Sequence, residues 1–331
     1  MKRNYLKQSG VLAAILVVVN VFTFAQSGGK SAISEINVRA EMNFLASDAM
    51  QGRGSGTLFE RIAAEYIGSQ FMQFGLEPAG EIGPDGKPTY VQTVTYKNRR
   101  TGADGKTWNA AGKITGTDKT LGSEVIVLSS HLDHVGVRDS APGDDKIFNG
   151  ADDDASGTVA VMELARVLAS GKKPKRTIYF VCFGSEEVGG YGSRYFAENL
   201  PFAKDKFIAN LQFEMIGRPD AKVNPEELWL TGYERSNLGP ELAKRGAKLV
   251  QDPHPTQNFF MRSDNIQFAR MGIIAHTVSS FGLHTDYHKA SDEIKTIDFR
   301  HMTRAINSMV KPVQWLINAS FKPTWNEGKK P

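Results

Sequence analysis

The chain has 331 residues, of which 40% are hydrophobic and 23% are charged, and its formal net charge is +4. This composition allows one large α/β domain with a sizeable core and excludes general disorder. Lys and Arg form no block interleaved with aromatic residues, so we expect no nucleic-acid partner. The single cysteine, Cys182, lies in the apolar run TIYFVCF and cannot form an internal disulfide.

The N-terminus has the three-part layout of a secretory signal peptide. A basic segment, residues 1–7, precedes an apolar run over residues 11–24, and Ala25 completes a small-residue cleavage pattern. The apolar run is short for a membrane span, and polar sequence follows it at once, so we expect no stable membrane anchor. We therefore predict that residues 1–25 are removed and that the mature chain, from about Gln26, is exported as a periplasmic or secreted protein.

Two helices and a strand are predicted in the first hundred residues. Ser34 can cap a helix that runs through about Ser47, and the glycine-rich connection SDAMQGRGSGT follows it. A second helix starts at Thr57, shows apolar positions near a 3.6-residue period, and ends at Gly75. A turn-rich loop then leads to a predicted strand over residues 89–96.

Strands and helices alternate in the second part of the chain. Residues 97–120, by contrast, are polar and glycine-rich with short strand-like pieces, and are too few for an inserted domain. The predicted strands are 125–130, 177–183, 207–216, 228–231 and 273–278, and the predicted helices are 158–170, 192–199, 237–245, 264–271 and 298–319. This alternation indicates an α/β three-layer sandwich whose mixed, mostly parallel sheet is flanked by helices. We expect one domain over residues 26–322 and a loose tail over residues 323–331.

The stretch 129–157 contains the strongest indication of chemistry. The letters HLDH follow a buried strand directly, and three consecutive aspartates precede a helix. Adjacent carboxylates repel one another, and a folded protein tolerates them mainly when a cation lies among them or water screens them. A solvated acidic loop is the common alternative. The flanking elements favour a metal site, because strand ends and helix starts meet in the cleft at the carboxyl edge of a sheet.

Further acids and histidines follow other predicted strands. They are Glu186 and Glu187 in FGSEEVGGYGS, Glu214 in NLQFEMIG, and the histidines in LHTDYHKASDE, with a weaker RSDN motif at residues 262–265. This inventory exceeds what one zinc ion needs and matches two ions roughly 3.5–4 Å apart that share a carboxylate. Oxygen ligands with imidazole and no thiolate fit zinc, manganese or cobalt. Of the two adjacent glutamates, one can bind metal while the other handles protons.

Taken together, HLDH, NGADDDASG, FGSEEVGGYGS, NLQFEMIG and YHKASDE, in this order, resemble the co-catalytic dizinc aminopeptidase family, which also contains glutamate carboxypeptidase and glutaminyl cyclase. The pieces LASDAMQGRGSGT and RSDNIQFARMGI resemble stretches of its bacterial members, so the similarity runs from about Leu45 to Asp298. It implies the phosphorylase/hydrolase-like fold of the zinc aminopeptidases. It also implies an exported zinc metallopeptidase that removes N-terminal residues from peptide substrates, with a water held between two zinc ions.

The resemblance also implies which residues hold the two ions. His131, Asp153 and Glu214 would hold one zinc ion. Asp153, Glu187 and His288 would hold the other, with Asp153 as the bridge. Many members have aspartate at the position of Glu214, and a glutamate, one methylene longer, can still bind metal.

Roles for the remaining site residues follow from the same resemblance. Glu186 would be the general base and later the acid, and Asp133 would orient His131. Tyr287 matches a tyrosine that steadies an oxyanion in some members. The peptide bond after Asp153 would be cis. His134 is assigned to the surroundings of the ligands or to the cleft wall.

Three other functions remain open on the sequence. A glutaminyl cyclase of the same fold needs only one zinc ion. A carboxypeptidase or dipeptidase needs a clamp for the substrate carboxylate, and the sequence assigns no arginine to it. A non-catalytic binding ectodomain would keep the fold, but such relatives tend to lose metal ligands, and here none is plainly missing.

Overall fold

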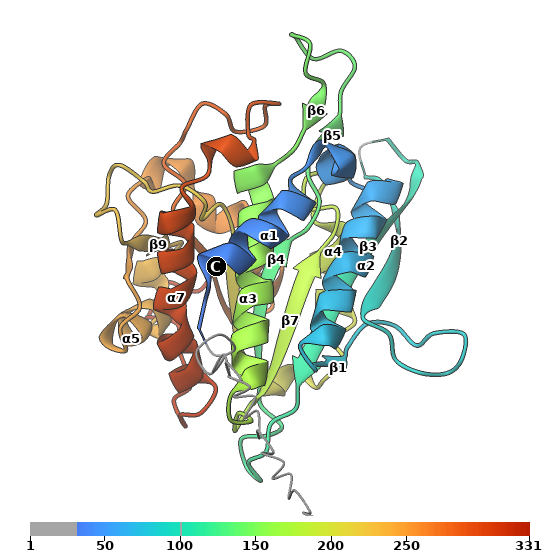
Figure 1. Ribbon diagram of the computed structural model, residues 1–331. Helices are drawn as coiled ribbons and strands as arrows, with labels where there is room; N and C mark the ends of the chain where they lie inside the picture. The colour runs from blue at the N-terminus through green and yellow to red at the C-terminus, as the bar shows by residue number, and fades with distance from the viewer. Residues whose placement is uncertain (1–31, 100) are drawn as a thin grey trace, which may run out of the picture.

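A nine-stranded mixed sheet lies between two layers of helices in the computed structural model, which describes residues 32–99 and 101–331 (Figure 1). The predicted signal peptide, residues 1–25, lies outside the described residues. The strand order is β1-β3-β7-β4-β8-β11-β9-β10, with β2 also paired to β3. The strands are β1 Glu77–Pro78, β2 Val91–Lys97, β3 Asp104–Ile114, β4 Val125–His131, β7 Thr177–Phe183, β8 Phe207–Phe213, β9 Leu228–Leu230, β10 Leu249–Gln251 and β11 Ile274–Ser279. A separate hairpin pairs β5 Gly136–Val137 with β6 Ile147–Phe148.

The centre of the sheet is parallel. Strands β7, β4, β8 and β11 run in the same direction, and every residue of β4 and β7 is buried. The first four residues of β4, VIVL, and the whole of β7, TIYFVCF, are nearly continuous apolar runs, as expected for parallel strands that helices cover on both faces. Their carboxyl ends therefore meet at one edge, which lies toward the β5–β6 hairpin at the top of Figure 1.

Helices cover both faces of the sheet and confirm the predicted sandwich. One face packs against α1 Glu35–Leu45, α2 Leu58–Gln73, α3 Gly157–Ser170, α5 Leu238–Lys244 and α7 Phe299–Leu316. The other face packs against α4 Tyr191–Glu198 and α6 Asn265–Arg270. Thr57 caps α2 by accepting hydrogen bonds from two backbone N–H groups, as predicted. No helix within the described ranges is long and apolar enough to cross a membrane.

The segment 97–120 differs most from its prediction. It contains the eleven-residue strand β3, which pairs with β7 and carries β1 and β2. The polar side chains of β3 obscured this strand, because tertiary contacts satisfy them. Asn109 is fully buried and donates hydrogen bonds to Gln92 Oε1 at 2.9 Å and to the carbonyl of Gly192 at 3.1 Å. The short strand β10 was also missed.

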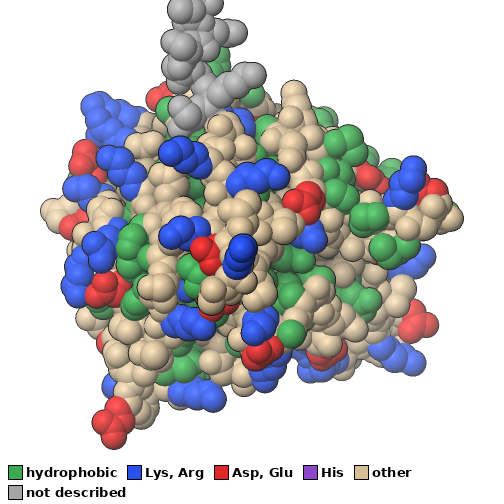
Figure 2. Space-filling model, turned by 90° about the horizontal axis from the view of Figure 1, so that it is seen from below, with side chains coloured by type: hydrophobic (Ala, Val, Ile, Leu, Met, Phe, Trp, Pro, Cys, Tyr) green, Lys and Arg blue, Asp and Glu red, His purple; other side chains and the backbone are tan. Residues whose placement is uncertain are grey.

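The segment 323–331, expected to be a loose tail, is attached to the rest of the chain at Trp325 and Asn326, and residues 326–331 are exposed. Trp325 packs against the core and donates a hydrogen bond from Nε1 to the carbonyl of Gly272 at 3.1 Å. The backbone N–H of Asn326 donates to the carbonyl of Arg235 at 2.7 Å. Figure 2 shows the end of the molecule opposite the carboxyl edge, where Lys and Arg side chains are spread among acidic, polar and apolar ones.

Candidate metal centre

Five predicted ligands come from separate loops at the carboxyl edge of the parallel strands. His131 is the last residue of β4, Glu187 follows β7, and Glu214 follows β8. His288 lies in the loop after β11, and Asp153 lies in a π-helical turn, Ala151–Ser156, directly before α3. Because parallel strands end at the same edge, residues up to 157 positions apart in the sequence can share one cleft.

Asp153 lies at the centre of this group and faces a different histidine with each oxygen. Its Oδ1 lies 3.1 Å from His131 Nε2, and its Oδ2 lies 3.1 Å from His288 Nε2. His288 Nε2 also lies 3.2 Å from Glu187 Oε2. Burial alone would raise the pKa of Asp153, but the contacts with His131 and His288 outweigh it and hold that pKa well below its usual range. The arrangement suits a carboxylate that bridges two cations.

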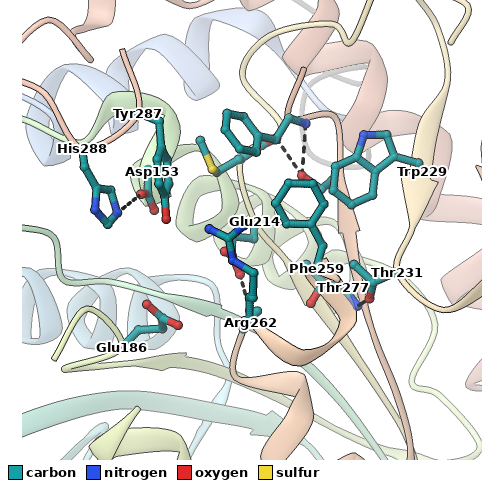
Figure 3. A pocket seen from close by; sticks show the side chains of 14 residues that line it. Asp153, Glu186, Glu214, Trp229, Thr231, Phe259, Arg262, Thr277, Tyr287 and His288 are labelled. Atoms are coloured by element: carbon teal, nitrogen blue, oxygen red, sulfur yellow. Dashed lines mark hydrogen bonds and ion pairs between the residues drawn. The ribbon is translucent and has the colours of Figure 1, made fainter. Parts of the chain in front are cut away.

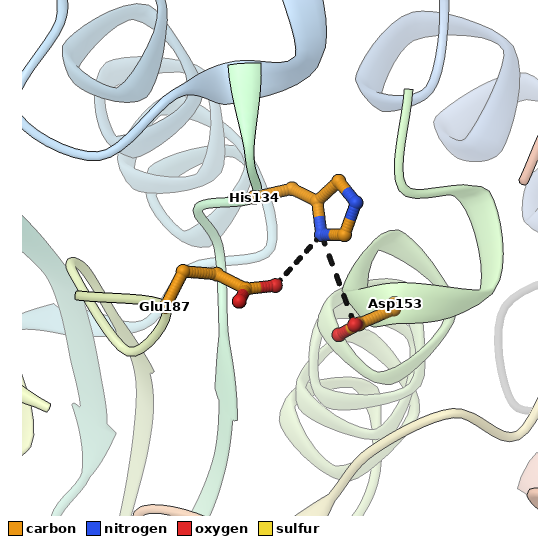
Figure 4. Close-up of side chains that lie close together, drawn as sticks. All are labelled: His134, Asp153 and Glu187. Atoms are coloured by element: carbon orange, nitrogen blue, oxygen red, sulfur yellow. Dashed lines mark ion pairs between the residues drawn. The ribbon is translucent and has the colours of Figure 1, made fainter. Parts of the chain in front are cut away.

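A third histidine belongs to the same cluster (Figure 4). His134 is fully buried, and its Nδ1 lies 2.9 Å from Glu187 Oε1 and 3.8 Å from Asp153 Oδ2. One ligand atom from each of these three residues lies within 4.8 Å of the other two. The sequence analysis assigned His134 to the wall or the surroundings of the site. The only sequence signal for His134 was its place in HLDH, three residues after the predicted ligand His131.

Glu214 lines the same pocket but is held differently from the other predicted ligands. It accepts a hydrogen bond from Ser263 Oγ, and it forms no ion pair with a histidine within the described part of the chain. Burial is the main cause that raises the pKa of Glu214 to about 7. Its carboxylate therefore faces the pocket next to Asp153, and its place as a ligand stays a prediction.

Glu186 and Tyr287 also line this pocket, which has an empty volume of about 470 Å³ (Figure 3). Burial and nearby carboxylates, Asp264 and Glu214, outweigh the nearby His131 and raise the pKa of Glu186 well above its usual range. Glu186 makes no ion pair with any described residue, so its carboxylate is available for proton transfer. In Figure 3, Asp153 and His288 lie on one side of the pocket, Trp229 lies on the other, and Glu214 and Phe259 lie between them.

Asp133 connects the two loops that carry His131 and the glutamate pair. Its carboxylate accepts hydrogen bonds from the backbone N–H of Glu186 at 3.0 Å and of Glu187 at 3.3 Å. Its Oδ1 lies 3.6 Å from His131 Nδ1. Ser55 Oγ donates to its Oδ2 at 2.5 Å. Asp133 therefore lies where it can orient His131 and the turn of the two glutamates together.

The neighbours of Asp153 mainly support the loop. Asp154 accepts backbone hydrogen bonds from His131 at 3.2 Å, Gly157 at 2.9 Å and Met215 at 3.0 Å. The peptide bond between Asp153 and Asp154 is cis, as the resemblance implies. Asp152 accepts a hydrogen bond from the backbone N–H of Gly217 at 2.7 Å. Asp154 Oδ2 lies 4.0 Å from His131 Nε2, but of the three aspartates only Asp153 faces both His131 and His288.

A buried polar network holds the aspartate turn from behind. Asp292 accepts hydrogen bonds from the backbone N–H groups of Asp152 at 3.1 Å and Asp153 at 3.0 Å. Arg218 contacts Asp292 at 3.2 Å and His284 Nδ1 at 3.1 Å. The other ring nitrogen of His284 lies 2.9 Å from Asp152 Oδ2, so His284 points into this network and His288 points into the cluster. Asp292 thus supports the turn that carries Asp153.

Arg53 ties the N-terminal segment to both ligand-bearing loops. Its side chain is 1% exposed and forms no ion pair with a described carboxylate. It donates hydrogen bonds to four backbone carbonyls, which belong to Leu132 (2.8 Å), Leu45 (2.6 Å), Asn149 (2.7 Å) and Gly150 (2.9 Å). Leu132 belongs to the HLDH loop, and Asn149 and Gly150 precede the aspartate run. From the sequence alone the QGRG segment is expected to be only a connection, and the hydrogen bonds of Arg53 are not foreseeable from it.

Arg53→Met should lower the free energy of unfolding by about 3 kcal/mol or more. The substitution leaves four buried carbonyls without their donor, and each hydrogen bond to a charged group contributes about 1.5–3 kcal/mol with incomplete additivity. Urea unfolding followed by tryptophan fluorescence would measure the loss. Arg300→Met, at an exposed position, is the control and should change stability by less than about 0.5 kcal/mol. If Arg53→Met and Arg300→Met changed the free energy of unfolding equally, the hydrogen bonds of Arg53 to the four carbonyls would not be stabilising.

Comparison with known proteins places these residues in a family context. The sequence model of peptidase family M28 matches residues 109–312. Leupeptin-inactivating enzyme 1 of Streptomyces exfoliatus is 30% identical over 189 residues, which cover 56% of this chain and 36% of that enzyme. Aminopeptidase YwaD of Bacillus subtilis is 27% identical over 207 residues, 60% of this chain and 43% of that protein. The matches thus span less than half the length of these curated relatives.

Solved structures share the fold over more of the chain. The aminopeptidase from Aneurinibacillus sp. strain AM-1 superposes with a TM-score of 0.65 at 17% identity, covering 88% of this chain and 96% of that one. At this identity the likeness concerns the fold. The family match includes the four loops that follow β4, β7, β8 and β11, but Arg53 and Ser55 lie before its first residue.

Proposed function

The chain belongs to peptidase family M28, and from this premise we propose that it is a zinc-dependent aminopeptidase that removes N-terminal residues from peptides. The observation that carries the proposal is the arrangement around Asp153, whose two oxygens face His131 and His288 separately. A site for a single zinc ion would not need a carboxylate that faces two histidines with its two oxygens. The aminopeptidase relative reported above is consistent with the choice of exopeptidase, and the donor set of imidazoles and carboxylates suits zinc.

Two zinc ions fit the residues present. His131, Asp153 and Glu214 would hold one ion, and Asp153, Glu187 and His288 would hold the other. When bound, zinc polarises a substrate carbonyl and lowers the pKa of water. Nitrogen and carboxylate donors without thiolate also allow manganese or cobalt as substitutes.

Residues of the chain would supply proton transfer and orientation. Glu186, raised in pKa and unpaired, would take a proton from the attacking water and pass it to the leaving amine. Tyr287 stacks on His288 with ring centroids 3.9 Å apart, and burial together with nearby carboxylates raises its pKa. Its hydroxyl therefore stays protonated at neutral pH and can donate a hydrogen bond to a developing oxyanion.

The pocket suits one N-terminal residue. The aromatic rings of Trp229, Phe259 and Phe281 line the pocket and would contact an apolar side chain. At the other end, Glu186 and Glu214 would attract the cationic α-amino group. Export through the predicted signal peptide is part of the proposal. N-terminal sequencing of the mature protein tests it, and a chain that retains residues 1–25 would refute it.

A peptide-cleavage assay tests the function directly. Free peptides with varied N-terminal residues would be incubated with the protein and followed by mass spectrometry, with and without a chelator. We expect stepwise loss of N-terminal residues that stops with chelator and resumes when zinc is added. N-acetylated copies of the same peptides are the control and should stay intact, because they lack the free amine.

Other outcomes of this assay would replace the proposal. Trimming from the C-terminus would indicate a carboxypeptidase, and cleavage restricted to dipeptides would indicate a dipeptidase. Cyclisation of an N-terminal glutamine would indicate a glutaminyl cyclase. No reaction over the whole panel with zinc present would indicate a binding ectodomain.

A further inference from the structure

His134 has a fully buried imidazole whose hydrogen-bonding capacity is unused. Neither of its ring nitrogens has a hydrogen-bond partner within the described residues, and the same holds for Glu187 Oε1. Yet His134 Nδ1 lies only 2.9 Å from that oxygen. The two atoms therefore lie within reach of one common cation. Buried polar groups are nearly always satisfied, so such a pair needs a partner.

The spacing of the surrounding atoms matches a shared cation. Two ligand atoms about 2.0–2.2 Å from one zinc ion in a tetrahedral site lie roughly 3.3–3.6 Å apart. His134 Nδ1 lies 2.9 Å from Glu187 Oε1 and 3.8 Å from Asp153 Oδ2. His288 Nε2 lies 3.1 Å from Asp153 Oδ2 and 3.2 Å from Glu187 Oε2. These four distances lie on both sides of the roughly 3.3–3.6 Å expected for two ligands of one tetrahedral zinc ion. In addition, both histidines face the same oxygen of Asp153, Oδ2.

The fold holds the His134 ring in this position. Gly150 lies against the imidazole so closely that a Cβ there would be 2.4 Å from the ring's Cγ and 2.6 Å from its Cδ2. The backbone N–H of His134 donates to the carbonyl of Arg53 at 3.2 Å. Arg53 in turn donates to the carbonyl of Gly150 at 2.9 Å. The ring is therefore confined between a glycine without a side chain and the two acidic residues.

We propose that His134 is a fourth protein ligand of the ion held by Asp153, Glu187 and His288. This inference rests on the proposed zinc site and makes its two halves unequal. The half with His134 has four protein ligands and is closed, in the manner of structural zinc sites, whereas the half with His131 and Glu214 has three and keeps a free position. The closed half should bind zinc more tightly and fill first.

Zinc titration of the metal-free, full-length protein tests the assignment without substrate. Isothermal titration with a competing chelator would resolve two affinities in the wild type. His134→Ala should weaken the tighter site by more than about 100-fold, beyond the 10- to 100-fold that loss of an outer-shell partner costs. His254→Ala is the matched control, because His254 is a buried histidine paired with a carboxylate, Asp220, at 2.7 Å outside the cluster. It should leave both affinities unchanged.

Cobalt substitution gives a second readout. With Co²⁺ in the tighter site, the intensity of the visible absorption bands should differ between the wild type and His134→Asn. The reason is that the variant lacks one nitrogen ligand. Unchanged bands, or an affinity loss of less than about 100-fold in the His134 variants, would overturn the assignment, because loss of an outer-shell partner alone costs about 10- to 100-fold. Circular dichroism of each variant checks that it folds. A wild type that binds no zinc would overturn the proposed function as well, so the two failures are distinct.

Discussion

Glu186→Gln is expected to keep both metal ions and to lower kcat by about 10²–10⁴-fold, the usual contribution of a general base. The amide has nearly the same shape as the carboxylate but cannot accept a proton. Glu186 makes no ion pair with the histidines of the cluster, so its charge is not needed to hold them. Its backbone N–H, which donates to Asp133 at 3.0 Å, is unaffected by the substitution.

Two measurements on the same preparation check this expectation. Turnover of an N-terminal peptide substrate gives kcat, and elemental analysis gives the zinc content per chain. Glu198→Gln, on the exposed side of α4, is the control and should turn over like the wild type. A variant that keeps normal turnover would remove Glu186 from the mechanism. A variant that loses zinc would show that Glu186 binds metal itself.

Asp153→Asn should have the largest effect on metal binding. Asp153 is the one carboxylate that faces both His131 and His288, each at 3.1 Å, so its loss affects both halves of the site. An amide presents only one oxygen and no charge, and cannot bridge two cations. We expect zinc content to fall from two ions to one or none and turnover to fall by at least about 10³-fold, since metal and bridging geometry are lost together.

Zinc content and turnover would again be measured side by side. Asp144→Asn, on the exposed loop between β5 and β6, removes an equivalent charge at a distance from the cluster and should change neither quantity. If Asp153→Asn retained two zinc ions, the bridge would have to lie at another carboxylate. If it lost zinc but kept turnover, the reaction would not depend on the metal centre.

The central strands and the edge that carries the site were predictable from local patterns. Apolar runs such as VIVL and TIYFVCF indicate strands buried on both faces, and residues directly after such strands collect at one edge. His131, Glu187 and Glu214 could be placed there on this ground alone. The strand β3 could not, because Asn109 and its polar neighbours are satisfied only by partners distant in the sequence.

The choice between similar neighbours also depended on the tertiary structure. His284 and His288 are four residues apart, a spacing that would place them on one face of a helix. His288 has a φ of 53°, so the segment is not helical, and the two rings point to different partners.

By itself, then, the sequence determined the buried parallel strands and the kinds of donor at their ends. These donors are oxygen and nitrogen atoms, and one glutamate beside a predicted ligand, Glu186, is left over for proton transfer. Only the tertiary structure decided how the donors are shared. Beyond the end of a strand the alternation of side chains stops, and the packing of each loop sets the direction of each side chain. That packing turned the two oxygens of Asp153 toward different histidines, brought His134 into the cluster against Gly150, and placed Arg53 between the two loops.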